Sequence, residues 1–255
     1  EQVAELLKSG KCKNVAIVTG AGTSVAAGIP DFRSKGGMHS ALDTSLLTAT
    51  EEQRKFLEGN AGNLIDRNLF RENQLPYLES RRPFILGVAN EDWSPTLSHA
   101  FMRVLYDKGV LRRVYTQNVD GLDDRLGLPS DVVVPLHNMR IAHCEFCTHD
   151  DKGKGSSKES ISSMGFREFA ALVQGNIKDI YGIDEELPPG SVKGPVDSVP
   201  ICCSSCGRAS MKPATTMMGG PLSRQFCDAV AADFGPGTMR SVTHTSDLPP
   251  EQDTA

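Results

Sequence analysis

Polar residues that could bind a small molecule follow an apolar stretch in the middle of this 255-residue chain. They are Gln117, Asn118, Val119 and Asp120. An amide and a carboxylate at a strand end can hold a carboxamide through paired hydrogen bonds, or polarise the hydroxyl groups of a ribose. The same residues also fit a plain turn that caps a helix beginning near Leu122.

A second group begins with small residues after an earlier apolar run, Gly20, Ala21, Gly22 and Thr23. Small residues let backbone N–H groups approach a phosphate, and the N-terminus of a following helix would favour its negative charge. The spacing departs from G-x-G-x-x-G, so a tight strand-to-helix turn without a ligand is the alternative. A polar, aromatic and cationic cluster that is poor core material follows: Asp31, Phe32 and Arg33.

Two C-x-x-C pairs form the third group, Cys144 with Cys147 and Cys203 with Cys206. Four thiolates in two such pairs match a closed tetrahedral zinc site, which is structural because it has no open position. The gap between the pairs is longer than in a compact zinc ribbon and indicates an insertion over residues 148–200. Cys202 is the alternative to Cys203, but the C-x-x-C spacing favours Cys203.

His137 follows a third apolar run and could act as a general base, because the free pKa of histidine lies near neutral pH. For a lone histidine, a half-buried structural residue is the alternative interpretation. His143, beside Cys144, is either a further metal ligand or a surface residue, and we favour the surface.

The elements that must position these groups are short β-branched runs, Val15–Val18, Val110–Tyr115 and Val132–Val134. A helical pattern over Thr96–Asp107, ended by Gly109, precedes the second run. Strands that alternate with helices predict a parallel, right-handed α/β sheet. Each polar group would then lie at the carboxyl end of a strand, where such folds bind ligands.

The other segments read mainly as helices and loops. We expect residues 35–94 to form a helical insertion with helices over 51–57 and 64–70, and with breaks at Pro76, Pro83 and Pro95. We expect an amphipathic helix over residues 1–8 and a short helix over 166–173. The run 150–163 is rich in Lys, Gly and Ser and predicts a flexible loop.

Composition narrows the class of protein. The net charge of −5 excludes a global attraction to nucleic acid or to an anionic membrane. No run approaches the ~20 apolar residues of a membrane span, and the N-terminus has no signal core. We therefore expect an intracellular protein, cytoplasmic or nuclear, that uses its cysteines for metal rather than disulfides.

Taken together, the glycine block and the Gln117–Asp120 block resemble the signature blocks of the sirtuins. The resemblance implies an α/β fold with a parallel Rossmann-like sheet, an inserted helical segment and a small zinc-ribbon module. It implies an NAD-dependent protein lysine deacetylase or deacylase, which transfers the acyl group to ADP-ribose and releases nicotinamide. NAD and one structural Zn²⁺ are the implied cofactors, and an acylated-lysine protein, such as a histone or another nuclear or cytosolic protein, is the implied partner.

The same resemblance implies roles for the first cluster. Arg33 would lie near the NAD phosphates and Phe32 near the nicotinamide, and Asp31 would support the site. The turn residues before them would complete the cofactor site.

For the second block, the resemblance implies that Asn118 and Asp120 shape the nicotinamide pocket and that Gln117 lies by the ribose. His137 would be the catalytic base that deprotonates a ribose hydroxyl. The family has glycine after this histidine, whereas this chain has Asn138, which fits if its backbone is left-handed.

Two stretches depart from the family pattern. Met217 and Met218 replace an aromatic pair, and they either line an acyl-lysine tunnel or belong to the core, which is the safer interpretation. After Phe234 the family's terminal strands are replaced by a polar, Pro-rich segment, which predicts a divergent or truncated C-terminus. The missing strands would expose a sheet edge and lower stability.

The expected organisation is therefore an NAD-binding domain over residues 1–139 and 211–234, a zinc-binding module over 140–210 and a disordered tail over 235–255. A non-catalytic zinc-binding relative with an incomplete NAD site is one alternative function. A mono-ADP-ribosyltransferase, which uses the same NAD chemistry on another acceptor, is the other.

Overall fold

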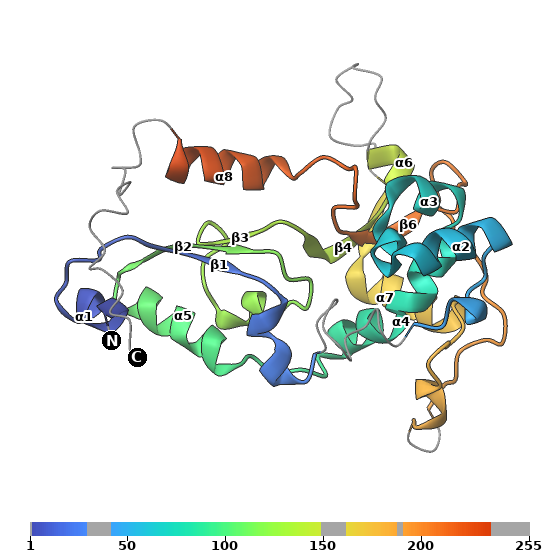
Figure 1. Cartoon of the computed structure of the whole chain (residues 1–255), viewed down its shortest axis with the longest axis horizontal. Helices are drawn as coiled ribbons and strands as arrows, with labels where there is room; N and C mark the ends of the chain where they lie inside the picture. The colour runs from blue at the N-terminus through green and yellow to red at the C-terminus, as the bar shows by residue number, and fades with distance from the viewer. Residues whose placement is uncertain (1, 30–41, 149–161, 188–190, 236–255) are drawn as a thin grey trace, which may run out of the picture.

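The computed structural model describes residues 2–29, 42–148, 162–187 and 191–235. A parallel sheet organises one end of this part of the chain and an antiparallel sheet organises the other (Figure 1). No described helix is long and apolar enough to cross a membrane. The predicted cluster at residues 31–33, most of the predicted polar loop and the tail after residue 235 lie outside the described residues.

The parallel sheet contains β1 (Val15–Thr19), β2 (Leu111–Thr116) and β3 (Val133–Pro135), in the order β1-β2-β3. All three strands were predicted from their β-branched runs, and the parallel pairing confirms the expected arrangement. The second and third strands begin one residue later than the sequence pattern suggested.

The register of this sheet brings its strand ends together. Thr19 pairs with Thr116, which in turn pairs with Pro135, so all three strands end at the same level. The segments that leave the sheet there begin at Gly20, Gln117 and Leu136, and the last of them carries His137.

Two helices cover the sheet, α5 (Leu97–Asp107) on one face and α8 (Arg224–Phe234) on the other (Figure 1). Side chains alternate between the two faces of β2, as they must in a strand. Val114 is buried in the apolar cluster on the α5 side. Tyr115 packs on the α8 side, where its hydroxyl donates to the Asp233 carboxylate at 2.7 Å.

The ends of α5 follow the sequence signals. Thr96 and His99 form a capping box at its start, and Gly109 follows its end with a left-handed φ of 67°. The chain begins with α1 (Gln2–Lys8), as predicted.

The glycine-rich turn differs from the prediction. It continues into two 3-10 turns, Ala21–Thr23 and Val25–Ala27, and not into an α-helix. Turns of this length carry no substantial macrodipole, because the dipole sums over aligned peptide units. The expected attraction of a phosphate by a helix N-terminus is therefore wrong, and only the exposed N–H groups of the turn can contribute.

The predicted helical insertion contains α2 (Glu51–Gly59), α3 (Arg67–Glu72) and α4 (Leu75–Asn90). The single helix expected over 64–70 is divided at Asp66. The carboxylate of this residue accepts the N–H groups of Asn68 and Leu69 and so starts a new helix.

Proline acts as a break at only some of the expected positions. Pro76 lies in the first turn of α4, where a missing N–H costs nothing. Pro83 lies inside α4, contrary to the prediction of a break. The helix continues because the residues after it, Phe84 and Ile85, are buried, and apolar burial offsets a local penalty of about 3 kcal/mol.

The antiparallel sheet contains β5 (Ser163–Gly165), β4 (Asn138–Cys144) and β6 (Met211–Ala214), in the order β5-β4-β6. The short helix α6 (Glu145–Thr148) follows β4. The predicted helix after residue 165 is present and longer, α7 (Phe166–Asn176). Ser163, which the sequence placed in the polar loop, belongs to β5.

The largest apolar core joins this second sheet to the helical insertion. It contains residues from α3, α4, α7, β4 and β6, among them Phe70, Leu78, Ile85, Phe169 and Met211. Because α4 packs against α7, the helical insertion lies beside the antiparallel sheet. Its helix α4 faces the carboxyl ends of the parallel strands.

Within the described residues, β1 is an edge strand that pairs only with β2. Val18 on β1 is 68% exposed, and Leu97 and Phe101 on α5 are 86% and 49% exposed. These residues line a shallow apolar depression. This part of the structure therefore has the uncovered sheet edge that the sequence predicted.

Candidate functional site

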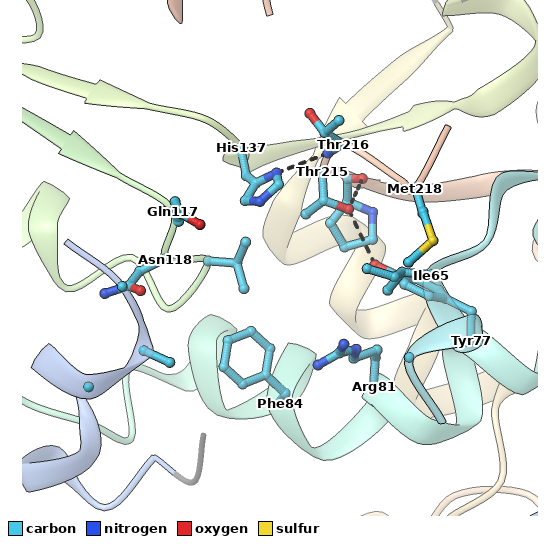
Figure 2. Close-up of a pocket in the computed structure, with 16 residues that line it drawn as sticks. Ile65, Tyr77, Arg81, Phe84, Gln117, Asn118, His137, Thr215, Thr216 and Met218 are labelled. Carbon is cyan, nitrogen blue, oxygen red and sulfur yellow. Dashed lines mark hydrogen bonds between the residues drawn. The ribbon is translucent and has the colours of Figure 1, made fainter. Parts of the chain in front are cut away.

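A pocket of about 440 Å³ opens where the parallel strands end, between the sheet, α4 and the segment after β6 (Figure 2). Its volume lies in the range of small-molecule sites, about 300–1,000 Å³. Its lining includes seven residues selected from the sequence: Gly20, Ala21, Gly22, Gln117, Asn118, Val119 and His137. The structure thus brings three separate segments to one cavity.

Two of the selected residues lie beside the pocket and do not line it. Asp120 is buried, and its carboxylate accepts from Ser24 Oγ at 2.6 Å and from the Leu122 N–H at 2.9 Å. These contacts form the turn that was the alternative interpretation of this residue. Thr23 donates its hydroxyl to the Gly20 carbonyl at 2.8 Å and so closes the first 3-10 turn.

The amide of Asn118 has a defined orientation. Because the Thr23 hydroxyl already donates to Gly20, it must accept a hydrogen bond from the Asn118 amide, whose Nδ2 lies 2.9 Å away. The amide oxygen therefore points away from Thr23, and it has no hydrogen-bond donor among the described residues. Asn118 can offer this acceptor to a carboxamide or a hydroxyl group in the pocket.

A buried network holds the backbone of Asn118. Its N–H donates to Thr116 Oγ1 at 3.1 Å, and Thr116 donates to the Asp123 carboxylate at 2.5 Å. His99 Nε2 lies 3.7 Å from the other carboxylate oxygen. Burial raises the pKa of Asp123, whereas Thr116 and His99 oppose this rise. The strand end is thereby tied to α5 beneath it.

The glycine turn can receive an anion through its backbone. The N–H groups of Ala21 and Gly22 open a 3-10 turn, where backbone donors have no partner inside the turn. A Cβ added at Gly20 or Gly22 would meet no atom within 4 Å, so the space beside the turn is open. These features fit a phosphate approaching the backbone.

His137 lies between the parallel sheet and the antiparallel sheet, after β3 and before β4. The Thr216 N–H donates to its Nδ1 at 3.0 Å, and the opposite edge of the ring faces the pocket (Figure 2). Burial, and then the positive charge of Lys212, lower the pKa of His137 to about 4. The ring is therefore neutral at pH 7.

Asn138, next in the chain, begins strand β4, so its backbone is extended and not left-handed.

Sequence reasoning missed three residues of α4 that line the pocket, Tyr77, Arg81 and Phe84 (Figure 2). They are spaced i, i+4 and i+7 and therefore share one face of the helix. Burial raises the pKa of Tyr77 and lowers that of Arg81. Glu79, Ser80 and Arg82 on the same helix are also polar, so no local pattern separates the pocket-lining face from the others.

The segment after β6 forms the pocket wall opposite the glycine turn. Thr215 accepts or donates a 3.4 Å hydrogen bond with the Tyr77 hydroxyl. Met218 is half exposed and lines the pocket, whereas Met217 is 4% exposed and belongs to the core. Of the two interpretations of this pair, lining of the pocket therefore applies to Met218 and membership of the core applies to Met217.

The four predicted metal ligands lie together at the start of α6 and beside β6. The sulfurs of Cys144, Cys147, Cys203 and Cys206 all lie within 4.8 Å of one another. Two opposite pairs are 3.6 and 3.8 Å apart. Tetrahedral zinc with bonds of ~2.3 Å places its sulfurs about 3.8 Å apart, so the set fits this ion.

Neighbouring groups stabilise the thiolate of Cys203. The backbone N–H groups of Ser205 and Cys206 donate to Cys203 Sγ at 3.3 and 3.5 Å. Burial raises the pKa of Cys203, but these bonds and one from Ser162 outweigh it and lower the pKa to about 6. Cys202 is exposed and lies outside the group, as predicted.

His143 is not the surface residue that we expected. It is half-buried on β4, and its Nε2 lies 3.0 Å from Lys212 Nζ. It is also outside the cysteine group. The cause is strand pairing, because His143 and Lys212 are partners across β4 and β6.

Comparison with known proteins identifies the family. The model of the Sir2 family matches residues 20–236. The chain belongs to the Sir2 family. It is 30% identical over 249 residues to NAD-dependent deacetylase sir2A of Dictyostelium discoideum, covering 96% of this chain and 39% of that protein.

Two vertebrate relatives agree with this assignment. NAD-dependent protein deacetylase sirtuin-2 of Danio rerio is 29% identical over 236 residues, covering 92% of this chain and 49% of the relative. NAD-dependent protein deacetylase sirtuin-3 of Mus musculus is 33% identical over 191 residues, covering 74% of this chain and 52% of the relative. This Sir2 family chain thus spans about half or less of each relative's length.

Proposed function

We propose that this chain is an NAD-dependent protein lysine deacetylase, which transfers an acyl group from lysine to ADP-ribose with release of nicotinamide. One observation carries the proposal: the strand-end residues of a Sir2 family chain converge with His137 on one pocket. The names of the relatives, all NAD-dependent deacetylases, support it. An acetylated nuclear or cytosolic protein, such as a histone, is the proposed substrate.

The pocket residues fit the groups of NAD. The open backbone of Gly20, Ala21 and Gly22 suits a phosphate, and the free amide oxygen of Asn118 suits the carboxamide of nicotinamide. Gln117 lies beside Asn118 and would bind a ribose hydroxyl. When bound, NAD supplies the ribose carbon that accepts the acyl oxygen, and nicotinamide is its leaving group.

The chain's own residues would exclude water and move a proton. Phe84 and Met218 line the pocket with apolar surface, which would limit hydrolysis of a reactive ribose. His137 is the histidine that lines the pocket, and we propose that it takes a proton from a ribose hydroxyl. Asp120 supports the site by fixing the turn next to Asn118.

The cysteine group would hold one structural zinc ion. All four positions of a tetrahedron are filled by thiolates, so the ion would supply stability and no open position for catalysis. Because Cys144 ends β4 and His137 precedes β4, the metal would also fix the strand next to the proposed base.

Calorimetric titration of the zinc-loaded protein with NAD tests the cofactor site. We expect saturable binding by the wild-type protein and a loss of about tenfold or more for Asn118→Ala, which removes one buried polar contact. Asn68→Ala, on the exposed face of α3, is the matched control and should bind normally. Folded wild-type protein that binds no NAD would overturn the proposal.

A non-catalytic zinc-binding relative is the second candidate. The uncovered edge of β1 supports it, because a ligand that spans both halves of the sheet would lack contacts there in the described residues. The same titration separates the two candidates, since this relative would contain zinc and bind no NAD.

A further inference from the structure

The hydrogen bond between Thr216 and His137 fixes the tautomer of the ring. A backbone N–H can only donate, so Nδ1 of His137 must accept, at 3.0 Å. In a neutral imidazole the other nitrogen, Nε2, then carries the hydrogen. The pocket-facing edge of the ring therefore presents a donor and has no lone pair for a proton.

A buried lysine holds the segment that makes this bond. Lys212 is 1% exposed and donates to the Thr215 carbonyl at 2.6 Å. Its other contacts are the Pro213 carbonyl, 3.4 Å away, Glu145, 3.3 Å away, and His143, 3.0 Å away. The ammonium group is thus anchored to β4 and α6 and fixes the backbone next to Thr216.

The far end of the same segment is also held. Met218 donates its N–H to the Ile65 carbonyl at 2.8 Å and accepts from the Arg67 N–H at 3.3 Å. Thr215, Thr216 and Met218 line the pocket, so an occupant of the pocket would touch the segment that controls the ring.

From this geometry we propose that Lys212 and the Thr216 N–H position His137, holding its Nε2–H toward the pocket until the Thr216 bond is released. This proposal concerns the same site as the proposed deacetylase function, and the catalytic role that it gives to His137 rests on that function. In the held state, His137 donates a hydrogen bond to a pocket oxygen. It becomes a base only after Nδ1 leaves Thr216, since proton uptake at Nε2 requires the hydrogen to reside on Nδ1.

The electrostatics agree with the held state. A proton on Nδ1 would place two donors, the ring and the Thr216 N–H, against each other. The cation Lys212 on β6 also disfavours a charged ring, and Arg81 lies across the pocket. The clash of donors favours the Nε2–H tautomer, and the charge of Lys212 favours a neutral ring.

Nitrogen-15 NMR of histidine-labelled, zinc-loaded protein tests the tautomer without NAD. His137→Gln assigns the signals of this ring among the six histidines. We expect the Nε2–H tautomer at neutral pH and a titration well below that of a free histidine. An Nδ1–H tautomer in the wild-type protein would overturn the proposal and would leave the proposed deacetylase function standing.

A matched pair of variants isolates the Thr216 N–H. Thr216→Pro removes the donor, whereas Thr216→Ala keeps it. We expect Thr216→Pro to raise the pKa of His137 by about one unit, as for the loss of one hydrogen bond, and to populate the Nδ1–H tautomer. Thr216→Ala should leave both unchanged. An unchanged tautomer in folded Thr216→Pro would contradict the proposal.

The contribution of Lys212 is tested by Lys212→Arg, which keeps the charge and changes the donor geometry. If Lys212 positions the segment, this variant should mix the two tautomers although the charge is retained. A tautomer identical to that of the wild-type protein would show that Lys212 is not a positioning residue.

Discussion

Replacing Cys203 of the metal group should abolish the stabilisation of the fold by zinc, whereas replacing the adjacent Cys202 should not. Cys203→Ser removes one of four sulfurs that already lie at zinc spacing, and Cys202→Ser alters an exposed thiol outside the group. With free zinc buffered about 1,000-fold above Kd, binding to the native state adds about 4.1 kcal/mol. This gain corresponds to a rise in Tm of roughly 8–16 °C for a domain of this size.

The assay is thermal unfolding in zinc buffer and in chelator, together with the zinc content of the purified protein. The wild-type protein and Cys202→Ser should contain one zinc per chain and show the full shift. Cys203→Ser should contain less than one zinc per chain and show no shift. Loss of zinc from Cys202→Ser with retention in Cys203→Ser would refute the assignment of ligands.

Three further predictions concern the framework around the site. Arg82→Met breaks a buried ion pair with Asp184, whose two contacts are both 2.9 Å, and should lower the free energy of unfolding by about 3–5 kcal/mol in urea titrations. Burial raises the pKa of Asp184, but its bonds with Arg82 and Gly194 outweigh this effect and lower the pKa overall. The ion pair therefore stabilises the protein above pH ~3.8, and this stability is lost as the pH falls through the lower pKa of the native state. Acid titration should show this loss in the wild-type protein and not in Asp184→Asn. Gly87→Ala would press a methyl group against the Trp93 ring and should cost about 1–3 kcal/mol, measured by the same urea titration.

The strand-end half of the pocket was predictable from sequence because the signals there are local. Short β-branched runs locate the strands, and parallel pairing requires their carboxyl ends to share one edge. Gln117, Asn118 and His137 therefore converge without any knowledge of side-chain packing. The zinc ligands were predictable for a similar reason, since a C-x-x-C pair places two thiolates on one turn.

The other half of the pocket depends on tertiary packing. Tyr77, Arg81 and Phe84 reach the site only because α4 packs against α7 and the antiparallel sheet. The contact that orients His137 comes from a backbone N–H, which every residue except proline has, so no sequence pattern marks it. Pro83 illustrates the same limit, because burial of the surrounding helix outweighs a strong local signal.

Product analysis tests whether this chain is a lysine deacetylase. Zinc-loaded protein is incubated with NAD and an acetyl-lysine peptide, and the products are identified by mass spectrometry, with His137→Ala in parallel. We expect deacetylated peptide, nicotinamide and acetylated ADP-ribose in equal amounts, and none of them from His137→Ala. Folded wild-type protein that forms no acetylated ADP-ribose, or that attaches ADP-ribose to the peptide, would contradict the proposed deacetylase function.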